Sequence, residues 1–138
     1  MSERLAGPQI LGVAALMGAC GGVTLILLLI ELDSSRSLPR MFFQSVLGAA
    51  LGGAVVAPLF GLNGVMGWIS GLFGICLATI IGSALAAVFL GGLEVLAFAP
   101  LLVMAFVFQD PVALIVWLSF AASIHLLVKR WRMVGRLS

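Results

Sequence analysis

The stretch VMGWISGLFGICLATIIGSALAAVFL, residues 65–90, contains no charged residue and no proline. The hydrocarbon core of a bilayer is about 30 Å thick, and a helix of about 20 apolar residues crosses it. Because backbone N–H and C=O groups find no water there, such a segment satisfies them within its own helix. Residues 65–90 therefore predict a membrane-spanning α-helix.

The rest of the chain has the same apolar character. Its 138 residues are 63% hydrophobic and only 9% charged, and its mean hydropathy is +1.30. A soluble domain carries about 25% charged residues, because its surface faces water. Lipid is the solvent that suits a surface this apolar. The basic residues form no stripe along a polar surface, which argues against nucleic acid as a partner.

Turn signals divide the chain into helices. Glycines and an asparagine mark a turn at 61–64, Gly91 and Gly92 end the stretch quoted above, and Gln-Asp-Pro at 109–111 splits the last apolar run. The sequence predicts an all-α integral membrane protein, a single domain (1–138) built as a compact bundle of about five transmembrane helices. The expected spans are 7–30, 41–60, 65–90, 93–108 and 112–130. Since the fourth is short, four spans are the alternative.

The two cysteines lie inside apolar segments, where a cysteine behaves as a small hydrophobic residue. MGACGG around Cys20 looks somewhat like a lipoprotein cleavage site. The apolar run continues beyond it to Ile30, so we interpret residues 7–30 as an uncleaved spanning helix. With one histidine and no paired cysteines, the sequence offers no metal site.

The basic residues predict how the chain is oriented. Cytoplasmic ends of membrane helices carry an excess of lysine and arginine. With five spans and a cytoplasmic C-terminus, the cytoplasmic basic residues are Arg36, Arg40, Lys129, Arg130, Arg132 and Arg136, and Arg4 lies outside. With four spans, Arg36 and Arg40 move to the outer side. The rule thus favours five spans in a bacterial inner membrane, with the N-terminus outside.

Small residues recur about every four positions in the first three spans. These small-residue stripes are Ala14, Gly18 and Gly22; Gly48 and Gly52; and Gly67, Gly71, Gly74, Ala78, Gly82 and Ala86. Residues four apart share one face of a helix, and small residues there let two helix backbones approach closely in lipid. The stripes can hold these helices together or dock a partner chain. Three stripes are more than one contact within the chain can use, so we expect at least one stripe to face outwards.

Between Arg40 and Lys129 the only formal charges are Glu94 and Asp110. Glu94 follows the Gly91–Gly92 break, so we interpret it as a first-turn residue, where the helix dipole favours a carboxylate. The functional alternative is an ion or proton site, because intramembrane acids often serve that purpose. Asp110 precedes Pro111 and is expected to cap the last helix.

His125 is the one residue with a local resemblance to a known family. Ala121 and His125 in FAASIHLLV, residues 120–128, resemble the pigment-ligating helix of bacterial light-harvesting polypeptides. The resemblance implies a pigment whose magnesium would be ligated by His125. The other interpretation is an interfacial hydrogen-bonding group, and it is the one we adopt; no cofactor other than bound lipid is expected.

No nucleophile–base pair or phosphate-binding loop is present in the sequence, so an enzyme is not expected. We expect a non-catalytic accessory subunit of a larger energy-converting, transport or photosynthetic membrane complex. Its partners would be other integral membrane proteins, or further copies of itself, within the lipid bilayer. The alternative is a small homo-oligomeric channel, transporter or holin-like pore with Glu94 in its pathway.

Overall fold

A computed structural model describes residues 7–31, 38–90 and 93–134, with the side chains of residues 31, 38, 90 and 93–97 left out. The described residues form five α-helices and no strand, which confirms the all-α prediction. The helices are α1 (Gly7–Glu31), α2 (Leu38–Val56), α3 (Gly64–Leu90), α4 (Leu93–Gln109) and α5 (Pro111–Val134), with a short 3₁₀ turn, η1 (Ala57–Leu59), after α2. The Gly91–Gly92 break and the basic residues Arg4, Arg36 and Arg136 lie outside the described residues.

Four of the described helices are long and apolar enough to cross a membrane. The candidate spans are Gly7–Ile30, Pro39–Leu59, Gly64–Phe89 and Pro111–Val134. In contrast, α4 has 17 residues, which at 1.5 Å per residue is about 26 Å and shorter than a bilayer core. The chain is a small helical membrane protein.

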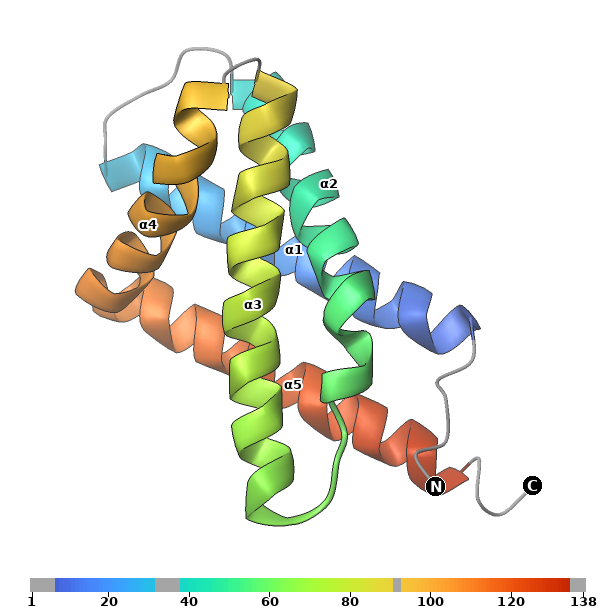
Figure 1. Cartoon of the computed structure of the whole chain (residues 1–138). Helices are drawn as coiled ribbons and strands as arrows, with labels where there is room; N and C mark the ends of the chain where they lie inside the picture. Colours follow the sequence, from blue (N-terminus) through green and yellow to red (C-terminus); the bar gives the residue numbers. More distant parts are fainter. Residues whose placement is uncertain (1–6, 32–37, 91–92, 135–138) are drawn as a thin grey trace.

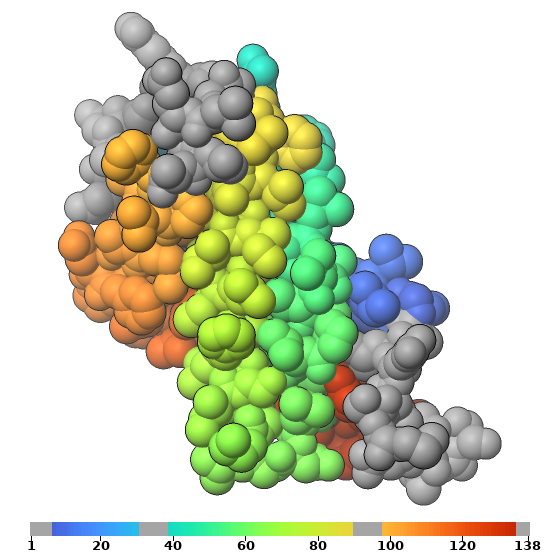
Figure 2. All heavy atoms as spheres, viewed as in Figure 1, coloured from blue at the N-terminus to red at the C-terminus, as the bar shows by residue number. Residues whose placement is uncertain are grey.

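Two of the helices, α1 and α5, cross the direction in which α3 runs (Figure 1). α2 packs on both α1 and α3, and α4 contacts α3 and α5. α1 and α5 also contact each other, and in Figure 1 both run obliquely across the direction of α3. The side chains of α2 and α3 meet along the near face of the molecule (Figure 2).

The α2–α3 turn has the structure that its residues predict. Pro58 lies in η1, where the missing N–H and fixed ring end the α-helix. Gly61 and Gly64 both have positive φ, 74° and 75°, which glycine adopts without steric cost. A side chain at Gly61 would also lie 2.7 Å from the backbone nitrogen of Lys129. α5 therefore passes directly against this turn.

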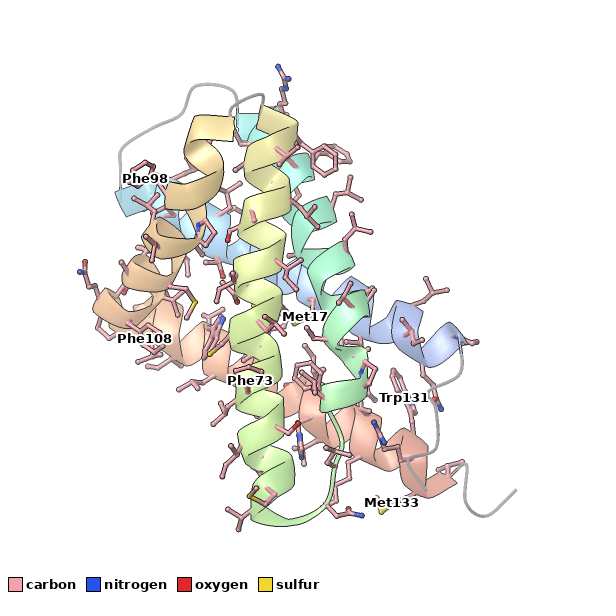
Figure 3. The ribbon with its side chains drawn as sticks, viewed as in Figure 1. Met17, Phe73, Phe98, Phe108, Trp131 and Met133 are labelled. Atoms are coloured by element: carbon pink, nitrogen blue, oxygen red, sulfur yellow. The ribbon has the colours of Figure 1, made fainter. Side chains whose placement is uncertain are left out.

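Two contacts place the start of α1 and the end of α5 at the same end of the bundle. The ring of Trp131 covers Gly12, where an added Cβ would lie 2.6 Å from the indole (Figure 3). The Arg132 guanidinium donates a hydrogen bond of 2.9 Å to the Pro58 carbonyl oxygen. The α2–α3 turn therefore lies at this end too, so α3 leads away from it and α5 leads back towards it.

This packing favours the four-span alternative over five spans. Five crossings would separate the start of α1 from the end of α5, and the Trp131–Gly12 contact brings them together. α4 runs from the end of α3 back alongside part of α3 to the beginning of α5 (Figure 1). Among the described helices it is the α-helix that is too short to be a candidate span. The sequence-based expectation of five spans rested on charge counting, which did not include these contacts.

The α4–α5 junction has the expected cap. The Asp110 carboxylate accepts a 2.9 Å hydrogen bond from the backbone N–H of Val112. Pro111 is the first residue of α5, where a proline loses no helical hydrogen bond. The prediction that Asp110 caps the last helix is confirmed.

Candidate functional site

All five helices contribute to a central cavity of about 140 Å³. α4 covers one side of it with Ala99 and Val103, and the other helices supply the remaining wall. The polar side chains at the wall are Thr24, Ser45, Thr79, Ser83 and Trp117. Most of the other lining residues are alanine, glycine, leucine or methionine, so the cavity is apolar with a few hydroxyl groups.

Four polar side chains of the central cavity, those of Ser45, Thr79, Ser83 and Trp117, donate hydrogen bonds within the bundle. Ser45 donates to the Gly21 carbonyl at 3.0 Å, which joins α2 to α1. The indole N–H of Trp117 donates to the Thr79 hydroxyl oxygen at 3.0 Å, which joins α5 to α3. Thr79 in turn donates to the Ile75 carbonyl at 2.8 Å. These protons are already used, so the wall suits a small apolar molecule or an acyl chain better than an ion.

The sequence did not predict this convergence. The serines and threonines are scattered along the chain, and each taken alone is an ordinary helix residue that bonds a backbone carbonyl. One signal was available: Ser45 lies three residues before Gly48, and Thr79 three residues before Gly82. Residues three apart share a helix face, so these hydroxyls follow the small-residue stripes into the interior.

The stripes of α1 and α2 are used inside the chain. An added Cβ at Gly18 would lie 3.1 Å from the Val46 carbonyl oxygen, and one at Gly22 would lie 3.0 Å from the Phe42 ring. Both neighbours belong to α2. The α2 glycines face α3 instead: Gly48 meets the backbone of Gly82, and a Cβ at Gly52 would lie 2.6 Å from the Ala78 carbonyl oxygen.

The α3 glycines also face atoms of this chain. A Cβ at Gly82 would lie 2.9 Å from the Cα of Ala49, one at Gly71 would lie 2.8 Å from Nδ1 of His125, and one at Gly74 would lie 3.2 Å from Leu59. Gly67 meets the carbonyl of Leu62, in the turn before its own helix. Six of these eight glycines face another α-helix, and Gly67 and Gly74 face residues between α2 and α3, so the expectation that one stripe faces outwards finds no support at these positions.

Glu94 lies in the first turn of α4, which begins at Leu93 as predicted. Its side chain lies outside the described residues, so its role as an ion or proton site stays a prediction. Equal ion flux into liposomes for the native chain and Glu94→Gln would contradict it.

His125 is almost completely enclosed, with 1% of its surface exposed. Its ring stacks on Trp68, with centroids 4.4 Å apart and an angle of 25° between the planes. The backbone N–H of Gly61 donates to Nδ1 at 3.4 Å, which leaves the ring proton on Nε2. A metal ligand needs a free electron pair on that nitrogen. His125 accepts a hydrogen bond, as the hydrogen-bonding interpretation expects, but its ring is buried in the bundle. The pigment implied by the light-harvesting resemblance stays a prediction.

The Trp117–Thr79 hydrogen bond supports a first prediction. Thr79→Val removes the acceptor. The indole N–H of Trp117, whose side chain is only 3% exposed, is then left without a hydrogen-bond partner. Hydrogen bonds between membrane helices average about 0.6 kcal/mol and reach about 1.7, so we expect a loss of about 1 kcal/mol in the free energy of unfolding. In a Trp117→Phe background the same change should cost less, because the donor is absent.

Titration of folded protein with sodium dodecyl sulfate in mixed micelles measures this difference. Ser119→Ala serves as the control, since that exposed hydroxyl donates only to Ile115 of its own helix. Equal losses from Thr79→Val in both backgrounds would show that the two side chains are not coupled.

No protein-family model, curated protein or solved structure matches this chain.

Proposed function

We propose that this small membrane protein is a non-catalytic accessory subunit of a larger membrane complex, which it joins through the outer face of α4. The observation that carries the proposal is a set of large apolar side chains on that face, each between 57% and 71% exposed: Phe98, Leu101, Leu102 and Phe108. Phe98 and Phe108 lie on the side of α4 that is turned away from α3 (Figure 3).

The spacing of these residues makes a continuous surface. Positions 98, 101, 102, 105 and 108 follow the three- and four-residue intervals of one helix face, and all five are exposed. The opposite face of α4 packs inwards through Val107, which is fully buried, and through Phe106. α4 is therefore apolar on both sides. Its own chain covers the inner side, and on the outer side it contacts the Phe108 ring through Trp117 of α5, with centroids 6.1 Å apart.

The position of α4 distinguishes it from the other exposed helices. A spanning helix meets lipid tails along its length, and apolar side chains are at home there. α4 has 17 residues and is shorter than a bilayer core, so we expect part of its outer face to approach headgroups and water. Exposed apolar surface costs about 25 cal/mol per Å² in water, so a protein partner that covers α4 is favoured.

The rest of the bundle supports a structural role. The central cavity has hydroxyl groups that already donate to carbonyls of the bundle, and the glycine stripes hold α1, α2 and α3 in close contact. A rigid, mostly apolar bundle with one uncovered helix face is what a scaffold subunit requires.

Site-specific photo-crosslinking in native membranes tests the proposal. We expect a photoreactive phenylalanine analogue at Phe98 or Phe108 to form protein adducts. The matched controls are Phe43 on α2 and Phe73 on α3, which are 76% and 63% exposed. These side chains should yield lipid adducts only, because their helices cross the bilayer.

The mass of the adduct identifies the partner. A different protein attached at both α4 positions supports the accessory role, whereas an adduct of twice the chain mass shows a homo-oligomer and overturns it. Lipid adducts at all four positions would also overturn it, since α4 would then be covered by lipid alone.

A further inference from the structure

We propose that a groove between α3 and α5 binds an uncharged apolar molecule through a carbonyl oxygen that accepts a hydrogen bond from Nε2–H of His125. This His125 groove has a volume of about 220 Å³. Trp68, Gly71 and Leu72 form its α3 wall, and Leu118, Ala121 and Ala122 form its α5 wall, with His125 between them.

The polar atom that needs a partner is Nε2 of His125. The side chain is 1% exposed, and Nε2 is itself buried and has no hydrogen-bond partner among the described residues, so an acceptor reaches it when a side chain of the groove wall moves aside. Since Nδ1 accepts the hydrogen bond from Gly61, Nε2 carries the proton and acts as a donor. A buried donor without an acceptor is unfavourable in a folded protein, so a ligand that supplies an acceptor there binds favourably.

The imidazole is held in place before any ligand arrives. Trp68 stacks on it at 4.4 Å, and Gly61 fixes Nδ1 from the turn. Gly71 leaves the space that the ring occupies, because a Cβ there would lie 2.8 Å from Nδ1. A donor with a fixed direction loses little freedom on binding, which favours recognition of one acceptor atom.

The walls of the groove define the chemistry of the ligand. None of the described residues that line it carries a formal charge, so an ionised group would be left without a partner. Gly71, Ala121 and Ala122 leave flat, apolar surfaces beside the donor. Trp68, Leu72 and Leu118 are each 41–42% exposed, which leaves the groove accessible from the bilayer. The ligand is thus apolar and neutral, and it carries a carbonyl acceptor.

Two sources can supply that chemistry, an ester carbonyl of a bilayer lipid or a ring carbonyl of a free quinone-like molecule. The groove lies at the α2–α3 turn, and the outer face of α4 is not part of it. The inference is therefore independent of the proposed docking role and stands or fails on its own experiment.

The chain contains a single histidine, so ¹⁵N-histidine labelling reports on His125 alone. The full chain is placed in nanodiscs of ester-linked lipid and of ether-linked lipid, which lacks ester carbonyls. Tetramethyl-1,4-benzoquinone is then titrated into both. Hydrogen bonding moves a proton resonance downfield. We therefore expect the Nε2–H resonance to lie further downfield in ester lipid than in ether lipid, to move downfield when the quinone is added in ether lipid, or to do both.

The two arms distinguish the sources. A shift in ester lipid alone identifies the bilayer lipid, and a saturable shift with quinone in ether lipid identifies a free carbonyl compound. An Nε2–H resonance that is identical in both lipids and unchanged by quinone overturns the proposal.

Two variants of adjacent residues test the location of the site. Ala122→Leu fills the groove. It should reduce the shift of the Nε2–H resonance at least about tenfold, as the loss of one good contact does. Ser123→Leu adds the same side chain at a neighbouring exposed position that does not line the groove, and it should leave the response within about twofold. Equal effects of the two variants would also overturn the proposal. The measurement on the native chain decides the matter even if a variant fails to fold.

Discussion

A reporter that is active only in the cytoplasm is expected to be active both when fused before Met1 and when fused after Ser138. The reason is the contact between Trp131 and Gly12, together with the hydrogen bond from Arg132 to the Pro58 carbonyl. These contacts put the beginning of α1 and the end of α5 at one end of the bundle. Four crossings by α1, α2, α3 and α5 satisfy this arrangement, and five do not.

The distribution of basic residues predicts which end of the bundle faces the cytoplasm. With four crossings, Arg4, Lys129, Arg130, Arg132 and Arg136 belong to the side that holds both ends, whereas Arg36 and Arg40 belong to the other. The excess of basic residues favours the cytoplasm for the chain ends. We therefore propose that both ends face the cytoplasm; the sequence-based expectation of an external N-terminus is the alternative that the reporter tests.

The same reporter inserted between residues 36 and 37 provides the control, and it should be inactive. The difference between the active and inactive positions should be all or none, because a crossing is either made or not. An inactive N-terminal fusion beside an active C-terminal one would establish an odd number of crossings and contradict the packing of α1 against α5.

Gly48→Ala is expected to lower the free energy of unfolding by about 2 kcal/mol, since overpacking of a tight contact costs about 1–3 kcal/mol. Alanine is the better helix former by about 1 kcal/mol, so a loss can come only from the helix contact. At Gly48 the new methyl group meets the backbone of Gly82, and its distance to the Ala86 nitrogen would be 3.1 Å. Backbone atoms cannot rotate away as a side chain can, so α2 and α3 have to separate.

Unfolding by sodium dodecyl sulfate in mixed micelles measures the change. Gly52→Ala should act in the same direction, because its methyl group would lie 2.6 Å from the Ala78 carbonyl oxygen. Gly7→Ala is the matched control: among the described residues, no atom beyond its chain neighbours and its own helix backbone lies within 4 Å of the position of its Cβ. If Gly48→Ala were as stable as the native chain, the close approach of α2 and α3 would be incorrect.

The sequence by itself determined the class of the protein and the extent of its helices. Hydropathy is a property of the side chains, so the apolar runs predict membrane helices whatever the packing. The helix ends are local as well. Proline at 58, glycines at 61 and 64, and the Asp110–Pro111 pair act through their own backbone, which explains why the predicted bounds lie within a few residues of those observed.

Only the tertiary structure decided how the helices are used. The small-residue stripes indicate close packing, but spacing along one helix does not say which neighbour it meets. Ser45, Thr79 and Trp117 meet at the central cavity, and Gly61 meets His125 across 64 positions of the chain. α4 has the composition of a spanning helix, yet it has only 17 residues and leads from α3 into α5, which returns to the start of α1. Such contacts depend on where helices cross, and helices made of similar apolar residues can cross in several ways.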